Sequence, residues 1–297
     1  MTAVADLRLR DPFVLPIARE GLYYIFGTNC RPHAWGPGHG FTGYASADLV
    51  TCDDEFPAFR PGEGFWATQD FWAPEVFEYG GRFYLFGTIK APDVRRGTQI
   101  FVADSPRGPF VPISAGPVTP ADRECLDGTL HVDDHGEPWM VFCHEWLQIC
   151  DGSMCAMRLS RDLTRAVDEP VMLFRGSDAP WARGGTDRFP DRMHYITDGP
   201  FLHRAADGSL LMLWSSFGAD GYAMGIARSS GGILGPWFQR EQPLYARDGG
   251  HGMLFTTFDG QLMLSLHAPN RSPGERPVFI PVDERAGELV ITAQRTR

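Results

Sequence analysis

A fivefold repeat runs through the chain and constrains its fold more than any other feature. Each copy has a small or acidic residue beside Pro or Gly, a short strand, a Gly turn, a more apolar strand and a third strand. The copies begin at DPFVLPIAREGLYYIFGTN, APEVFEYGGRFYLFGTI, DGTLHVDDHGEPWMVFCHE, TDGPFLHRAADGSLLMLWSS and HGMLFTTFDGQLMLSLHA. They recur at roughly 50 to 70 residues, a spacing typical of four-stranded units with variable loops. The repeat predicts an all-β, five-bladed β-propeller, with residues 1–297 as a single domain.

Glycine, proline and aspartate separate short apolar segments along the whole chain. β-Branched and aromatic residues in these segments alternate with polar ones or run continuously, as they do in strands. No long segment has the apolar spacing of three, four and seven residues that an amphipathic helix needs. The 34 glycines and 24 prolines supply turns for many short strands. A two-sheet β-sandwich, which also has short strands at regular spacing, is the main structural alternative.

Composition and charge argue against several classes of protein. No apolar run approaches the ~18 residues of a transmembrane helix. The N-terminus MTAVADLRLRDP enters the first repeat without a secretory signal, so we expect a cytoplasmic protein or a chain whose leader has been removed. The formal net charge is −10 with the acidic residues spread out, which disfavours nucleic acid or an anionic membrane as a partner.

The six cysteines have no zinc-binding spacing. In a chain without a secretory signal we expect them to be free, partly buried thiols rather than disulfides or metal ligands. They are Cys30, Cys52, Cys125, Cys143, Cys150 and Cys155.

The register of the repeats brings three carboxylates and a histidine together. The copies align on their turn glycines, which are Gly21, Gly81, Gly136, Gly208 and Gly260. Nearly the same point, eight to ten residues upstream, is then occupied by Asp11, Ala73, Asp127, Asp198 and His251. Because the first strand of each propeller blade lines the central channel, we expect these residues in a ring at one mouth of the channel.

Turn formation explains each aspartate separately but not their convergence. Carboxylates gathered in one pocket repel one another and lose solvation, which is costly unless the protein uses them. Such neighbours raise one another's pKa, so one carboxyl can stay protonated as an acid while another stays ionised as a base. Glycoside hydrolysis requires this division, because an acid protonates the leaving oxygen and a base activates water.

At these positions the sequence resembles glycoside hydrolase family 43. The similarity covers essentially the whole chain, through the motifs RDPFVL, FWAPEVF, LDGTLHVDDHGEPWMVF, TDGPFL and GGHGMLF. Members of the family are five-bladed propellers that act mainly as α-L-arabinofuranosidases, arabinanases and β-xylosidases, by inversion. The resemblance implies that Asp11 is the general base and that Asp127 tunes the pKa of the acid and orients it. RDP and WAP also occur in related propeller families that retain configuration.

The proton donor departs from the family pattern. The family's acid is the Glu of a Glu-Gly-Pro motif, whereas this chain has Asp198, Gly199 and Pro200. Aspartate is one methylene shorter, which sets the donor back by roughly 1.5 Å. We predict Asp198 as the acid, with Glu145 of the CHEW stretch as the alternative. If no loop brings Glu145 inward, it is a loop carboxylate paired with an arginine.

Four further carboxylate and aromatic candidates have both a structural and a functional interpretation. Glu75 of WAPE lies just inside an inner strand, which favours a structural hydrogen-bonding group over a catalytic one. Sugar faces are apolar and edged with hydroxyls, so aromatic platforms are expected beside polar donors. Trp72, Trp146 and Trp214 are candidates, although core packing is the commoner explanation for any one of them. Trp72 is the best candidate, because its register places it near the pocket.

The long first-repeat segment TNCRPHAWGPGHGFTGY is a candidate cover for the pocket. It would contribute His33, Trp35 and His39, although a plain surface connection fits its glycines and prolines equally well. Arg204 and His267 end or follow strands near the channel. Arg204 is taken as a candidate substrate contact, and packing and ligand contact stay open for both residues.

His251, in GGHGML, resembles the family's channel histidine, which in many members sits beside a bound water or a calcium ion. It is therefore a candidate both for substrate contact and for metal binding. No carboxylates with calcium-loop spacing accompany it. We therefore expect no required cofactor, with a calcium ion or an ordered water as alternative occupants of the channel.

The leading functional prediction is an inverting, exo-acting glycosidase on terminal furanosides or xylosides, with arabinofuranosides first. Its carbohydrate partner would contain arabinose, galactofuranose or xylose. A sugar-binding propeller with weak or no hydrolysis is the second hypothesis, motivated by the change from Glu to Asp. A retaining propeller glycosidase is the third. The sequence leaves open the sugar, the linkage and the choice between endo and exo action, because these depend on loop geometry.

Overall fold

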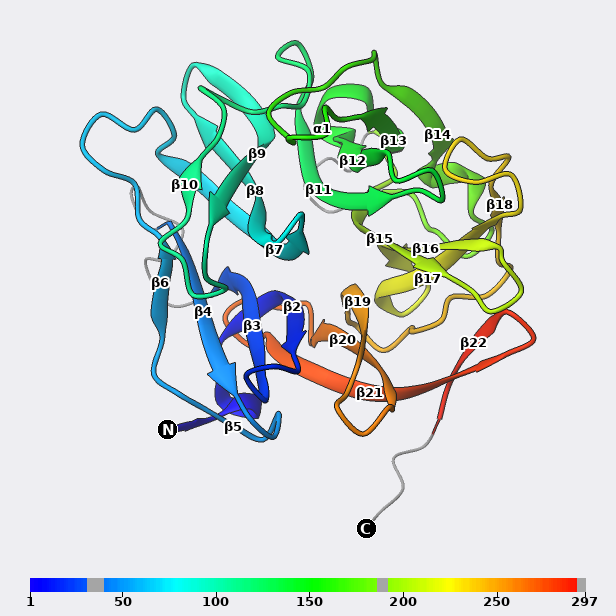
Figure 1. Cartoon of the computed structure of the whole chain (residues 1–297). Helices are drawn as coiled ribbons and strands as arrows, with labels where there is room; N and C mark the ends of the chain where they lie inside the picture. The colour runs from blue at the N-terminus through cyan, green and yellow to red at the C-terminus, as the bar shows by residue number, and fades with distance from the viewer. Residues whose placement is uncertain (31–39, 186–191, 293–297) are drawn as a thin grey trace.

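The repeats form a ring of five antiparallel sheets around a central channel (Figure 1). The computed structural model describes residues 1–30, 40–185 and 192–292. Within every sheet the strands follow one another in chain order, and the first strands of neighbouring sheets contact one another around the ring. The predicted five-bladed propeller is confirmed. The β-sandwich alternative is wrong, because the five sheets are radial and separate.

Each blade has four strands. Blade 1 consists of β2 (Leu9–Ile17), β3 (Leu22–Asn29), β4 (Phe41–Ser46) and β6 (Phe56–Phe59). Blade 2 consists of β7 (Gln69–Tyr79), β8 (Arg82–Ala91), β9 (Val94–Ala103) and β10 (Val111–Pro112). Blade 3 consists of β11 (Cys125–Val132), β12 (Pro138–His144), β13 (Ser153–Arg158) and β14 (Val171–Arg175). Blade 4 consists of β15 (Asp198–Arg204), β16 (Leu210–Gly218), β17 (Gly221–Ser229) and β18 (Phe238–Gln239). Blade 5 consists of β19 (Gly250–Thr256), β20 (Leu262–Ala268), β21 (Arg276–Arg285) and β22 (Glu288–Ile291).

Few described elements lie outside the blades. The short strands β1 (Thr2–Ala3) and β5 (Thr51–Cys52) pair with each other beside blade 1. The helical elements are single turns, namely η1 (Val4–Asp6), α1 (Trp146–Ile149) and η2 (Gly176–Asp178). Across the described ranges, no helix combines the length and apolar character needed to cross a membrane. All six cysteines are free and five are buried, as predicted.

Glycine is required at the turn between the first two strands of every blade. These turn residues have φ between 66° and 87°, the left-handed region that glycine enters without steric cost. They are Gly21, Gly81, Gly136, Gly208 and Gly260. This requirement explains why the repeats align on these five positions.

Each inner strand is interrupted by a β-bulge with one residue in the left-handed conformation. The φ values lie between 45° and 56° at Asp11, Ala73, Asp127, Gly199 and His251. At four of the five bulges the backbone N–H donates to a side chain on the second strand of the preceding blade. The acceptors are Thr28, Thr88, Ser215 and His267. One level of hydrogen bonds therefore joins neighbouring blades at the bulges.

The alignment of the repeats misplaces blade 4 by one residue. It puts Asp198 at the bulge, but the structure has Gly199 there, because hairpin lengths differ by a residue between blades. Glycine is needed at this bulge, since a Cβ would lie 2.6 Å from the ring of His251. The residues equivalent to Asp198 immediately precede the other bulges, and they are Arg10, Trp72, Leu126 and Gly250.

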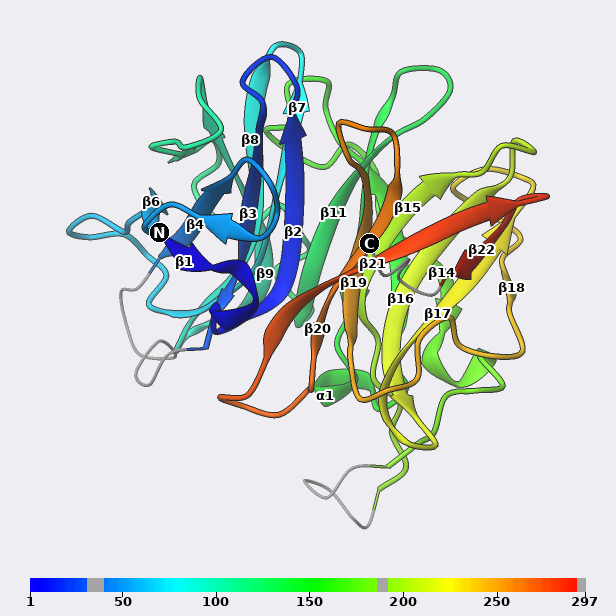
Figure 2. The ribbon, with the colours of Figure 1, turned by 90° about the horizontal axis from the view of Figure 1, so that it is seen from below.

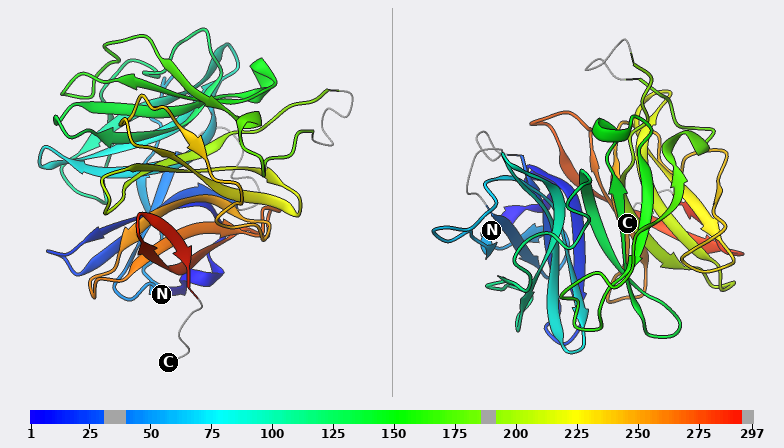
Figure 3. Two further views of the ribbon diagram at one scale, coloured as in Figure 1. Left: turned by 90° about the vertical axis from the view of Figure 1, so that its right-hand side faces the viewer. Right: turned by 90° about the horizontal axis from the view of Figure 1, so that it is seen from above.

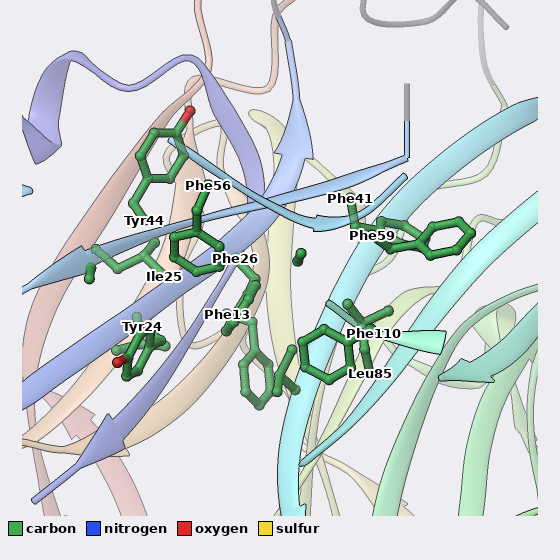
Figure 4. Close-up of a cluster of buried hydrophobic side chains, with 14 of the residues drawn as sticks. Phe13, Tyr24, Ile25, Phe26, Phe41, Tyr44, Phe56, Phe59, Leu85 and Phe110 are labelled. Atoms are coloured by element: carbon green, nitrogen blue, oxygen red, sulfur yellow. The ribbon is translucent and has the colours of Figure 1, made fainter. Parts of the chain in front are cut away.

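Aromatic side chains fill the interface between blades 1 and 2 (Figure 4). Phe41 meets Phe71 and Phe101 edge-on, with ring centroids 5.6 Å and 5.9 Å away. Gly87 makes room for it, because a Cβ there would lie 2.2 Å from the Phe41 ring. Burying each such ring stabilises the fold by about 1.5–3 kcal/mol. This packing holds the inner strands of the two blades in fixed positions.

The ring closes between blades 5 and 1 without a shared strand, since each of these blades is built from its own end of the chain (Figure 3). Side chains make the closure. Ser265 Oγ donates to the carbonyl of Pro12 at 2.7 Å, and Tyr23 stacks on Phe258 with centroids 4.2 Å apart. The backbone N–H of Asp11 donates to His267 Nδ1 at 3.2 Å. The candidate base therefore lies directly on the closing seam.

Candidate active site

One mouth of the channel holds a pocket of about 190 Å³. Most of the residues that line it lie near the starts of the inner strands, and Glu145 lies directly before α1. Figure 2 shows α1 at the end of the ring where β2 begins. The lining residues are Arg10, Asp11, Trp72, Leu126, Asp127, Glu145, Asp198 and His251. All except Glu145 are bulge residues or their immediate predecessors. The bulges therefore turn two successive side chains of an inner strand toward the same pocket.

Asp11 is buried among groups that favour its ionised form. Thr28 Oγ1 donates to its Oδ2 at 2.7 Å, and Nδ1 of His251 lies 3.2 Å from its Oδ1. Burial acts to raise the pKa of Asp11. His251 and Arg10, with a smaller contribution from the Thr28 hydrogen bond, outweigh that effect and hold the pKa below its ordinary value of 3.8. Asp11 is therefore ionised at neutral pH, as a general base must be.

His267, fully buried on β20, holds the backbone of Asp11 in place. Burial lowers the pKa of His267 to about 3, so the ring is neutral. Its Nδ1 accepts the N–H of Asp11, which leaves Nε2 to donate to Asn270 Oδ1 at 3.1 Å. The sequence left packing and ligand contact open for this residue. Its place is behind Asp11, and it does not line the pocket.

Asp127 is buried between the other two aspartates. Its Oδ2 accepts the N–H of Gly199 at 3.0 Å and lies 3.7 Å from His251 Nδ1. Burial and then repulsion from Asp11 raise the pKa of Asp127 to about 8. Through Gly199 this carboxyl also fixes the backbone next to Asp198.

Asp198 lies on β15, and among the described residues no arginine or lysine forms an ion pair with it. Tyr222, on β17, donates its hydroxyl to Asp198 Oδ2 at 2.9 Å. Burial and then Asp127 raise the pKa of Asp198 to about 7, against the opposing effects of His251 and Tyr222. The Asp127 and Asp198 carboxyls titrate as a coupled pair, and together they retain a proton near neutral pH.

Glu145 follows β12 and enters the pocket as the residue before α1. It forms an ion pair with Arg96 of β9, which also binds Asp70 at 2.7 Å. The Arg96 guanidinium lies over the Trp72 ring, 4.5 Å from its centroid. Burial raises the pKa of Glu145, while Arg96 opposes that rise. The sequence predicted either a carboxyl that enters the pocket or a loop carboxylate paired with an arginine. Glu145 is both, because it lines the pocket and pairs with Arg96.

Sequence and structure comparisons now identify the family. The sequence model of glycosyl hydrolases family 43 matches residues 2–282. The chain belongs to this family. It is therefore a glycoside hydrolase, with the five-bladed fold and the buried carboxylates described above.

Two solved structures resemble the chain along its whole length. An endo-arabinase from Bacteroides thetaiotaomicron VPI-5482 is 43% identical with a TM-score of 0.89, and the alignment covers 97% of this chain and 99% of that one. An exo-1,5-α-L-arabinanase from a bovine ruminal metagenomic library shares the fold at 19% identity, with a TM-score of 0.69 and coverage of 99% and 100%.

A curated relative matches part of the sequence. It is an extracellular exo-α-(1→5)-L-arabinofuranosidase of Cellvibrio japonicus (strain Ueda107), 27% identical over 177 residues. The match covers 54% of this chain and 46% of the relative, so the chain matches less than half of the relative's length.

The predicted aromatic platforms of this family 43 enzyme lie in three different environments. Trp72 lines the pocket, backed by Arg96. Trp146 stacks on His194 with centroids 4.5 Å apart and is not part of the pocket wall. Trp214 is fully buried and donates its ring N–H to Gln239, so it belongs to the core.

The remaining predicted contacts lie away from the described pocket. Arg204 is at the far end of β15, where it pairs with Asp134 at 2.9 Å, because the strand carries it six residues beyond Asp198. His33, Trp35 and His39 fall outside the described residues. Glu75 is buried in β7 and does not line the pocket. Burial, and to a smaller extent repulsion from Asp127 and Asp11, raises the pKa of Glu75 well above its ordinary value.

The described side chains are not arranged to coordinate a metal ion. His251 is held by its N–H to Ser215 at 2.8 Å, and its Nδ1 faces the two carboxylates Asp11 and Asp127. Within the described ranges, no group of three or more His, Cys, Asp or Glu side chains is arranged to hold a metal ion. The donor set therefore does not fit a directly coordinated calcium ion.

Four residues of the site are not found by reasoning from sequence. Arg10 and Leu126 line the pocket because they precede bulges, and correct bulge register would have predicted them. Tyr222 and Arg96 come from third strands and carry no recognisable motif. Only the folded blades bring their side chains to Asp198 and Glu145.

Proposed function

We propose that this family 43 enzyme is an inverting, exo-acting α-L-arabinofuranosidase. The observation that carries the proposal is that two aspartates lining one pocket have pKa values shifted in opposite directions. The pKa of Asp11 is lowered by His251 and Arg10 in spite of burial, and the pKa of Asp198 is raised by burial and Asp127. An ionised base and a protonated acid are the pair that inverting hydrolysis needs.

In the proposed reaction Asp11 accepts a proton from water as the water oxygen attacks the anomeric carbon. Asp198 gives its proton to the glycosidic oxygen while the bond from that oxygen to the anomeric carbon breaks. The electrons of that bond stay with the leaving oxygen. Attack from the opposite face inverts the configuration, and exchange with solvent restores both protonation states. Asp127 shares the retained proton with Asp198 and fixes the neighbouring backbone through Gly199.

Arabinose is favoured as the sugar by two relatives described by their names as acting on arabinan or arabinofuranosides. Exo action is favoured by the size of the pocket. Its volume of about 190 Å³ is below the roughly 300–1,000 Å³ typical of sites for drug-sized ligands. Such a space suits one sugar residue, with Trp72 as the platform for its apolar face.

The proposal is tested with nitrophenyl α-L-arabinofuranoside, β-D-galactofuranoside and β-D-xyloside, and with linear α-1,5-linked arabino-oligosaccharides. We expect the arabinofuranoside to be cleaved fastest and free arabinose to be the first product from the oligosaccharides. Proton NMR during the first turnovers should show the β-anomer. Oligosaccharide products would assign endo action, and the α-anomer would assign retention. Saturable sugar binding without turnover of any substrate would support the binding-module hypothesis.

A further inference from the structure

The proposed acid is held by a single hydroxyl from another strand. Tyr222 Oη donates to Asp198 Oδ2 at 2.9 Å. Because Oδ2 accepts this bond, the proton of the acid form belongs on the other oxygen, Oδ1. From this geometry we infer that Tyr222 is a positioning residue, which fixes the short Asp198 carboxyl and selects the oxygen that delivers the proton. The inference rests on the proposed role of Asp198 as the acid.

Tyr222 is itself rigidly held. Its side chain is 1% exposed. It stacks on His267 with centroids 5.7 Å apart and planes 20° from parallel, and Phe217 meets it edge-on at 5.5 Å. Gly250 leaves room for the ring, because a Cβ there would lie 2.8 Å from it. The hydroxyl therefore has a fixed position from which to orient a carboxyl.

The same clamp also reaches the base. His267, on which Tyr222 stacks, accepts the backbone N–H of Asp11 and is fixed by Asn270. A continuous contact path thus runs from Asp198 through Tyr222 and His267 to Asp11. It sets the acid and the base relative to each other across blades 4, 5 and 1.

A short acid gains more from such a clamp than a long one. Asp198 is one methylene shorter than the glutamate of the family motif, and a misplacement of about 1 Å in a catalytic group can cost 10²-fold in rate. A glutamate at this position would carry its carboxyl beyond the reach that the Tyr222 hydroxyl now has. The aspartate and the tyrosine therefore form a matched pair.

Titratable groups on five strands surround Asp198. They are Asp127 on β11, His251 on β19, Arg10 on β2, Cys143 on β12 and Tyr222 on β17. Of these, Tyr222 is the one that donates a hydrogen bond to the carboxylate. Hydrogen bonding to the ionised form lowers a carboxyl pKa, so removing the hydroxyl should raise it. The other four groups are unchanged by that substitution.

The test is Tyr222→Phe, which keeps the ring and removes the hydroxyl. Its matched control is Tyr24→Phe, which removes a hydroxyl bound to Glu20 in blade 1, where Tyr24 is equally buried. We expect Tyr222→Phe to reduce kcat about tenfold more on an arabino-oligosaccharide than on the nitrophenyl arabinofuranoside, because only the poor leaving group needs a well-aimed proton. The basic limb of the kcat/KM profile should move to higher pH. Tyr24→Phe should change neither.

A double-mutant cycle with Asp198→Glu removes any ambiguity from folding. We expect Asp198→Glu to be less active than the wild type, and Tyr222→Phe to have little further effect in that background, since the contact is already lost. Equal losses on both substrates with an unmoved basic limb would overturn the role of Tyr222. So would an undiminished effect of Tyr222→Phe in the Asp198→Glu background. If Asp198→Ala itself shows no dependence on the leaving group, the proposed acid is wrong, and that failure is distinct from failure of the positioning role.

Discussion

Asp11 and Asp198 lie on opposite sides of one pocket, on β2 and β15, with β19 and His251 between them. Asp11 is buried and Asp198 is half-buried, and loss of solvent acts to raise the pKa of both, yet their surroundings differ. Asp11 directly contacts His251 and the Thr28 hydroxyl and lies 3.8 Å from Arg10, whereas Asp198 contacts a tyrosine hydroxyl and has its pKa raised by a second carboxyl, Asp127. The difference teaches that the neighbours, and not burial itself, decide which of two identical side chains keeps its proton.

The largest loss of activity should follow substitution of Asp11, the ionised aspartate of the two. Asp11→Ala should lower kcat by about 10²–10⁴-fold on every substrate, because no group then takes the proton from water. Affinity for arabinose should stay within about tenfold, since the base acts mainly in the transition state. Azide needs no base, so adding it should partly restore release of nitrophenol. Asp104→Asn, on an exposed ion pair with Arg82, is the control. Near-normal turnover by Asp11→Ala would reject the base assignment.

Substitution of Asp198, the proposed proton donor, should reduce activity by an amount that depends on the leaving group of the substrate. Asp198→Ala should reduce kcat by about 10²–10⁴-fold on an arabino-oligosaccharide. It should affect an activated nitrophenyl substrate far less, because nitrophenolate leaves without a proton. The two rates are measured side by side on the same preparation. A uniform loss on both substrates would argue that Asp198 binds sugar and does not donate a proton.

Glu145 offers a contrast within the same pocket, since it is paired with a permanent cation. Glu145→Gln weakens the ion pair with Arg96, which backs Trp72, so it should lower kcat/KM by about tenfold on both substrates alike. Glu78→Gln, which breaks the exposed pair with Arg19, should have no effect on activity. If the loss with Glu145→Gln is confined to the poor leaving group, Glu145 is the acid.

The smallest effect is expected from chelation. The described donors around His251 do not form a three-ligand metal site, so we expect EDTA to leave kcat/KM within about twofold. Activity is measured before and after dialysis against EDTA, and again after calcium is added. Complete loss that calcium restores would show that the channel depends on an ion.

The fold could be predicted from sequence because it depends on local requirements that repeat. Each hairpin turn needs a left-handed glycine, such as Gly208, and the apolar segments between turns have the length of strands. The register of blade 4 could not be predicted to a single residue, because the number of residues between the bulge and the turn glycine differs between blades. Gly199 therefore occupies the bulge position that was expected for Asp198. Asp198 lies one residue before it and still lines the pocket.

The charged and hydrogen-bonding partners of the site carboxylates were harder to predict from the sequence than the carboxylates themselves. Asp11, Asp127 and Asp198 stand in motifs at the starts of inner strands, so their convergence follows from the repeat alone. Arg96 and Tyr222 lie on third strands, and their approach to Glu145 and Asp198 depends on how blades pack. Arg204 was expected near the channel, but a strand of β15's length carries it to the opposite end of the blade.

The pH dependence of kcat/KM tests the division between Asp11 and Asp198 most directly. An aryl arabinofuranoside that wild type and variants all turn over is measured across the pH range. The acid must keep its proton and the pKa of Asp198 is raised to about 7, so wild-type activity should fall as pH rises through about 7. The base must be ionised and the pKa of Asp11 is lowered from 3.8, so the acidic limb should lie below pH 3.8. The account predicts that Asp198→Ala keeps the acidic limb and loses the basic one, while Glu145→Ala keeps both. A basic limb that persists in Asp198→Ala and disappears in Glu145→Ala would contradict it.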